Sequence, residues 1–154
     1  MDQLLVPIVL NCAINWVLAY AIYRGKAVIP LWGLESVSSD ILGISLMLPW
    51  ANCVINTAVL KRHARQGRVP RVGVDVNRWP WRLGPTSVMR RGLVLALLCL
   101  VFVALPTLGL LNFFGLKHFT LRTCLAVNAG YAALLAALTS PVIAVSAAAQ
   151  FGLE

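Results

Sequence analysis

Long apolar runs separated by short polar segments dominate the pattern of this 154-residue chain. A helix needs about 20 mainly apolar residues to cross the hydrocarbon core of a bilayer. Four runs approach or exceed that length, at residues 4–23, 41–60, 92–114 and 123–149. The pattern therefore predicts an all-α, polytopic membrane protein whose single domain is a bundle of four transmembrane helices.

The composition of the chain agrees with a membrane as its solvent. Hydrophobic residues make up 60% of the chain and charged residues only 12%, whereas a soluble domain carries about 25% charged residues. The first residues lack the basic segment and the cleavage site of a secretory signal, so we expect the first helix to be retained. The four cysteines form no Cys-x-x-Cys pair, and we expect them to act as small apolar side chains.

Basic residues concentrate in the loop at residues 61–91, which carries nine of the thirteen Lys and Arg residues. Loops rich in Lys and Arg stay on the cytoplasmic side, so this loop and, with four crossings, both termini are predicted to be cytoplasmic. Within the loop, indole and guanidinium groups alternate, and we expect anionic lipid headgroups to contact Arg78, Trp79, Trp81 and Arg82. No recognition motif for nucleic acid accompanies the charge, so nucleic acid is not an expected partner.

The motif Asn-x-x-x-Asn occurs twice inside apolar runs, as NCAIN and NCVIN. A spacing of four places Asn11 with Asn15, and Asn52 with Asn56, on one face of each helix. The helical rise puts both motifs roughly 10 Å from the cytoplasmic helix ends. Because helices joined by a short loop are usually neighbours, the two faces can meet. Either the amides hydrogen-bond across the helix pair, or they line a path for a substrate or water.

Three prolines, Pro49, Pro106 and Pro141, fall inside the second, third and fourth predicted spans. Each removes a backbone donor from its helix, so each marks a predicted kink. Neighbouring hydroxyl groups, such as that of Thr107, are close enough to satisfy some of the freed carbonyls.

Small residues are frequent in the fourth span. Ala126 with Gly130, and Ala129 with Ala133, are spaced as small-x-x-x-small pairs, which let helix backbones approach closely. One such face can serve the bundle and another a second copy of the chain or a different membrane protein. A homo-oligomer or a membrane-protein partner is therefore expected.

The predicted outer loops carry Glu35, Asp40 and His118, a set that could perform acid–base chemistry. Such residues are more often solvated loop ends, and Asp40 suits the start of a helix. The chain contains no nucleotide-binding or zinc-hydrolase motif and no nucleophile elbow. We therefore expect no catalytic residues, no metal and no cofactor.

The run YRGKAVIPLWGLESVSSDILGISLMLPWANCVINTAVLKR, followed by RQGRVP, resembles uncharacterised bacterial four-helix inner-membrane proteins. The shared pattern is a Pro-Leu-Trp-Gly loop, an Asp before the second helix, a Leu-Pro within it and a basic end. The resemblance covers about the first half of the chain and implies a bacterial inner (plasma) membrane, with no activity attached. The chain departs from small multidrug-resistance transporters, which need an embedded Glu in the first helix, because Asn and Cys stand there instead.

Three classes of function remain open. The first is a small non-catalytic membrane protein that oligomerises or supports a membrane complex, and the lack of embedded charge favours it. The second is a small-solute or lipid permease or channel with an Asn-lined inner cavity. The third is a lipid-modifying membrane enzyme that uses the outer-loop Glu35, Asp40 and His118.

Overall fold

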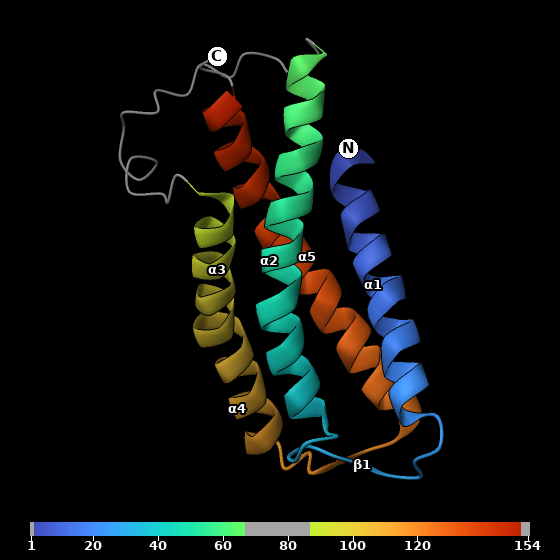
Figure 1. The fold of residues 1–154 in the computed structure, drawn as a ribbon. Coiled ribbons are helices and arrows are strands. Elements are labelled where there is room, and N and C mark those ends of the chain that lie inside the picture. Colours follow the sequence, from blue (N-terminus) through green and yellow to red (C-terminus); the bar gives the residue numbers. More distant parts are fainter. Residues whose placement is uncertain (1, 67–86, 152–154) are drawn as a thin grey trace.

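The computed structural model describes residues 2–66 and 87–151, which form an elongated bundle of helices capped at one end by a small β-pair (Figure 1). Its elements, in chain order, are α1 (Asp2–Tyr23), β1 (Ile29–Pro30), α2 (Val37–Arg65), α3 (Val88–Cys99), the π-helical turn η2 (Leu100–Ala104), α4 (Leu105–Phe113), β2 (His118–Phe119) and α5 (Leu121–Phe151). The predicted apolar runs fall on these helices to within a few residues at each end.

Three helices of the described chain are long and apolar enough to cross a membrane. Their apolar parts are Val37–Val59, Val88–Phe113 and Leu121–Ile143. In α1 the apolar stretch Ile8–Tyr23 is shorter, below the roughly 20 residues that a crossing needs. The mainly helical, membrane-type fold predicted from the pattern is confirmed at this level.

Helix α5 packs against more than one of the other helices. Helices α1 and α2 both pack against α5, and α2 also packs against α3 (Figure 1). Contacts between α1 and α2 are few beside those that each makes with α5, and the Asn faces that the sequence allowed to meet border a shared cavity. The loop that connects α1 and α2 runs across the end of the bundle (Figure 1).

The loops at this end are held together by the pairing of β1 with β2, which the sequence pattern did not predict. Ile29 pairs with Phe119 and Pro30 with His118 in antiparallel register. Ile29 and Phe119 are buried, as is Tyr23, whose hydroxyl donates a hydrogen bond to the Ser36 carbonyl at 3.0 Å. The pair thus fixes the ends of α1, α2 and α5 relative to one another.

Helix α2 begins with reciprocal serine capping. The Ser39 amide donates to Ser36 Oγ at 3.3 Å, and the Ser36 amide donates to Ser39 Oγ at 3.2 Å. These bonds satisfy backbone donors that a helix start leaves free. Asp40 follows in the first turn, where the helix dipole favours a negative charge.

The three prolines lie inside helices, and one of them is accompanied by a change of helical register. Directly before Pro106, the Leu105 amide donates to the Leu100 carbonyl, the i to i+5 bond of a π-turn. Thr107 Oγ1 donates to the Val103 carbonyl at 2.7 Å. Helix α2 continues through Pro49, and α5 continues through Pro141.

Candidate binding groove between α1 and α2

A cavity of about 650 Å³ lies between α1 and α2, with α5 contributing to its wall. Most of its lining is aliphatic. Its polar lining consists of Asn11, Asn15, Ser39, Asp40, Asn52, Asn56 and Asn128. The structure therefore brings all four predicted asparagines to one site, which we call the groove, and adds Asp40 and Asn128 to them.

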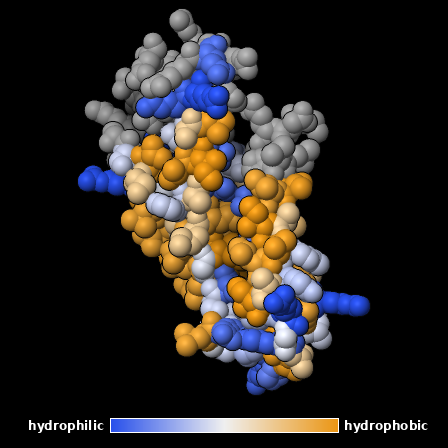
Figure 2. All heavy atoms as spheres, turned by 45° about the vertical axis from the view of Figure 1, so that its right-hand side comes forward, coloured by the Kyte–Doolittle hydropathy of each residue, from blue (hydrophilic) through white to orange (hydrophobic). Residues whose placement is uncertain are grey.

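The groove opens on the side of the bundle. Leu10 and Leu18 of α1 and Met47 and Ile55 of α2 line it and are also exposed at the surface. In Figure 2 hydrophilic residues are visible between two hydrophobic ridges on the face that carries α1. Such an arrangement places polar groups beside surfaces that hydrocarbon chains would contact.

The asparagines of the two motifs do not all make the cross-helix bonds that the structural interpretation requires. Asn15 Nδ2 donates to the Asn11 carbonyl of its own helix at 2.8 Å. Asn52 is 9% exposed, and within the described chain its Nδ2 has no hydrogen-bond partner. A buried donor without a partner is costly, and no bond between helices satisfies this one among the described residues.

At the capped end of the groove, Asp40 and Asn128 join α2 to α5. Asn128 Nδ2 donates to Asp40 Oδ2 at 2.6 Å. Asn128 is 1% exposed, and its Oδ1 has no partner among the described residues. The sequence analysis did not single out Asn128. The signal that could have found it is an isolated amide inside an otherwise apolar span.

The described lining of the groove has one acidic side chain and no basic one. Asp40 is its single ionisable carboxylate, and no Lys, Arg or His of the described chain lines it. The nearby Lys26 forms an ion pair with Glu35 in the exposed loop. That pairing lowers the pKa of Glu35, through the hydrogen bond and then through the charge of Lys26.

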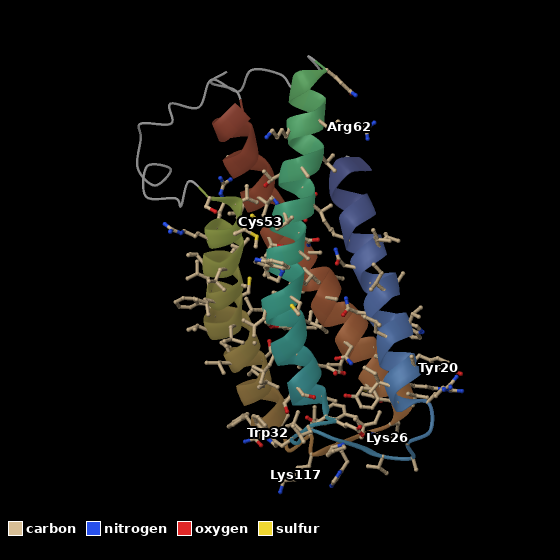
Figure 3. The ribbon with its side chains drawn as sticks, in the orientation of Figure 1. Tyr20, Lys26, Trp32, Cys53, Arg62 and Lys117 are labelled. Atoms are coloured by element: carbon tan, nitrogen blue, oxygen red, sulfur yellow. The ribbon has the colours of Figure 1, made fainter. Side chains whose placement is uncertain are left out.

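The proposed outer-face set is divided by the structure. Asp40 lines the groove, Glu35 is engaged with Lys26, and His118 is exposed on β2. Lys26, Trp32 and Lys117 lie at this same end of the bundle, and Arg62 lies at the opposite end (Figure 3). Within the described residues, no three His, Cys, Asp or Glu side chains gather as a metal site.

The other predicted features that the structure describes do not line the groove. Of the small-residue pairs on α5, Ala126 and Gly130 are exposed, whereas Ala129 is buried and Ala133 half-buried. The aromatic and basic segment with Arg78, Trp79, Trp81 and Arg82 lies outside the described residues. All four cysteines are described and none forms a disulfide; Cys53, Cys99 and Cys124 are buried.

Fold and groove together define a helical protein of the membrane-spanning class with a polar groove on its side. Comparison with known proteins adds no closer assignment, because no family model, no curated protein and no solved structure matches this chain.

Proposed function

We propose that this protein is a four-span integral membrane protein that moves a membrane lipid along the groove between α1 and α2. This is the permease alternative among the classes that the sequence leaves open. The observation that carries it is the gathering of the four motif asparagines, Asp40 and Asn128 on one laterally open cavity.

The proposal includes α1 as the fourth crossing. Its 22 residues correspond to about 33 Å of helix, close to the thickness of a bilayer core. The start of α1 and the end of α5 lie at the end of the bundle where α2 ends and α3 begins (Figure 1). Because the basic segment at residues 61–91 connects these two helices, we place that end in the cytoplasm of a bacterial inner membrane, with anionic headgroups contacting the segment.

The length of the polar lining supports lipid transfer. Asp40 and Asn56 are sixteen positions apart on α2, or about 24 Å along its axis, which is most of a hydrocarbon core about 30 Å thick. Asn52 and Asn15 lie between these levels. A headgroup moving along the groove would meet hydrogen-bonding groups over most of the barrier, while its acyl chains remain beside the apolar ridges. Desolvation is the main barrier to a polar group in hydrocarbon, so such a lining lowers it.

The test uses the purified protein in unilamellar vesicles with a fluorescent phospholipid that a membrane-impermeant reductant quenches from outside. Wild-type protein should speed the loss of inner-leaflet fluorescence, and the double variant Asn11→Leu/Asn52→Leu should return it to the protein-free rate. Asn112→Leu is the matched control, because Asn112 is an exposed amide on α4 outside the groove. Equal rates with and without wild-type protein would overturn the proposal, and so would full activity in the double variant. Release of an entrapped solute without lipid transfer would overturn lipid as the substrate.

Self-association is a second proposed property, supported by a different observation. Ala126 and Gly130 are exposed one turn apart on α5, and no heavy atom outside the local helix backbone comes within 4 Å of the position of a Gly130 Cβ. A second helix can approach such a face closely. Gly130→Ile should abolish cross-linked dimers in vesicles while Gly109→Ile, at another open glycine, should leave them; unchanged dimers in Gly130→Ile would exclude this face.

A further inference from the structure

The capped end of the groove presents two hydrogen-bond acceptors on neighbouring helices. One is the carboxylate of Asp40, whose Oδ2 accepts from Asn128 Nδ2 at 2.6 Å. The other is Asn128 Oδ1. A carboxylate only accepts, so the amide must turn its NH₂ toward Asp40, and this fixes which atom of Asn128 is the carbonyl oxygen. The orientation of the acceptor therefore follows from chemistry.

The protein leaves one of these acceptors without a donor. Asn128 is 1% exposed and its Oδ1 has no partner within the described chain, although a buried acceptor without a donor is costly. Asp40 is the single carboxyl group of a groove whose described lining holds no cation. A charged group at membrane depth normally pairs with a partner of opposite charge. The missing partner is therefore both a cation and a hydrogen-bond donor.

Lys26 is the nearest protein group that could have served as this partner. It is instead paired with Glu35 and lies 5.4 Å from the centroid of the Tyr23 ring. Because Glu35 engages its ammonium in the loop, Lys26 does not line the groove. The charge of Lys26 therefore acts on Asp40 from outside the groove, and a ligand would supply the cation in contact with the carboxylate.

We propose that Asp40 and Asn128 bind the primary ammonium of an ethanolamine phospholipid. The inference rests on the proposed function, in that the groove must admit a lipid. One N–H of the ammonium donates to the carboxylate of Asp40 and a second donates to Asn128 Oδ1. The groove continues from Asp40 past Ile44 and Met47, an apolar wall for the acyl chain. A free amine would leave that wall uncovered.

The same chemistry excludes choline lipids as equal ligands. Their quaternary nitrogen carries no N–H, so it can offer charge to Asp40 but no hydrogen bond to Asp40 or to Asn128. The expected preference for ethanolamine over choline lipid is roughly tenfold, the size of one hydrogen bond to a charged group.

The experiment measures lipid retained on the purified protein by native mass spectrometry, after exposure to equimolar ethanolamine and choline lipids with matched acyl chains. Wild-type protein should retain mainly ethanolamine lipid, and successive N-methylation of the headgroup should lower retention stepwise. Asp40→Asn should remove the preference. Glu35→Gln, which changes the neighbouring loop carboxylate outside the groove, should keep it.

Equal retention of both lipids by wild-type protein would overturn the inference, as would an unchanged preference in Asp40→Asn. Free ethanolamine that displaces the lipid at equal concentration would show that the acyl chain does not matter and would overturn the assignment to a lipid. The N-methyl series uses unaltered protein, so it decides the question even if Asp40→Asn does not fold. If the protein prefers ethanolamine lipid but does not transfer phospholipid in vesicles, only the proposed function is refuted. If it transfers phospholipid but shows no headgroup preference, only this inference is refuted.

Discussion

The two sides of α2 meet their neighbours in opposite ways. Toward α3 the contact is closed: a Cβ added at Gly92 would lie 3.1 Å from Trp50 Cδ1 and 3.3 Å from Cys53 Cβ. Toward α1 the same helix borders the groove of about 650 Å³ and presents Asn52 and Asn56 to it. One helix thus combines a close-packed face with an open polar face.

The difference shows that small residues and polar residues have opposite effects on how closely two helices pack in lipid. Without a hydrophobic force between helices in lipid, close packing depends on residues small enough to let backbones approach, and Gly92 serves that purpose. On the face of α2 toward α1, the amides of Asn52 and Asn56 line a cavity and do not pack against a neighbouring helix. The closed face should therefore carry stability, and the open face should carry binding.

The largest expected effect follows from filling the closed face. Gly92→Leu should destabilise the fold by about 2–3 kcal/mol, because a Cβ at this position would already lie 3.1 Å from Trp50 Cδ1 and 3.3 Å from the Trp50 backbone. Unfolding by denaturing detergent would measure it. Gly109→Ala on the same continuous helix is the control, since nothing lies within 4 Å of its Cβ position. Equal stability of Gly92→Leu and wild type would show that the α2–α3 contact is not closed.

Removing one inter-helix hydroxyl should have a smaller effect. Ser45 Oγ and Tyr131 Oη are 2.6 Å apart and join α2 to α5. Tyr131→Phe should cost about 1 kcal/mol, the usual worth of one hydrogen bond between helices in a membrane. A double-mutant cycle with Ser45→Ala would isolate the pairwise energy. Strictly additive losses would mean that the two hydroxyls do not interact.

On the open face of α2, we expect a substitution to leave the stability of the fold unchanged or to raise it. Asn52→Leu removes a buried donor that has no partner in the described chain, so stability should stay level or rise by up to about 1 kcal/mol. The same unfolding assay measures it, beside Asn112→Leu as an exposed amide control. A loss above 1 kcal/mol relative to that control would return Asn52 to a structural role.

The smallest effect is expected at the Lys26–Glu35 pair in the loop. Pairing lowers the pKa of Glu35 from its ordinary value of 4.5 in the folded state. The pair therefore contributes stability above that ordinary pKa and loses it as pH falls through the lowered pKa. Because Glu35 is exposed, the contribution is small. Melting temperatures of wild type and Glu35→Gln should differ slightly at pH 7 and converge as pH falls below the lowered pKa of Glu35; a gap that widens in acid would contradict this.

The local sequence pattern was sufficient to predict where the helices lie. It was not sufficient to predict which elements pack against one another. The runs at 41–60 and 123–149 lie within α2 and α5 because apolar length and the absence of charge act residue by residue along the chain. The pairing of β1 with β2 was missed because it joins two-residue segments far apart in sequence. The short loop suggested that the Asn faces of α1 and α2 could meet, whereas both helices pack mainly on α5 and leave a cavity between them.

The candidate site was also predicted only in part from the sequence. The spacing of Asn11 with Asn15 and of Asn52 with Asn56 was enough to place each pair on one helix face. It could not show that Asp40, interpreted as a helix start, and Asn128, not singled out, would line the same cavity. Those contacts depend on how α5 crosses the other two helices.

By itself the sequence determined the solvent of this protein, the extent of its helices and the face on which each asparagine lies. These properties come from transfer free energy and helical periodicity, which act locally. Only the tertiary structure decided that α1 and α2 stay apart around a groove, and that Asp40 meets Asn128 in it. Such outcomes depend on side-chain packing between segments distant along the chain, and no short stretch of residues encodes them alone.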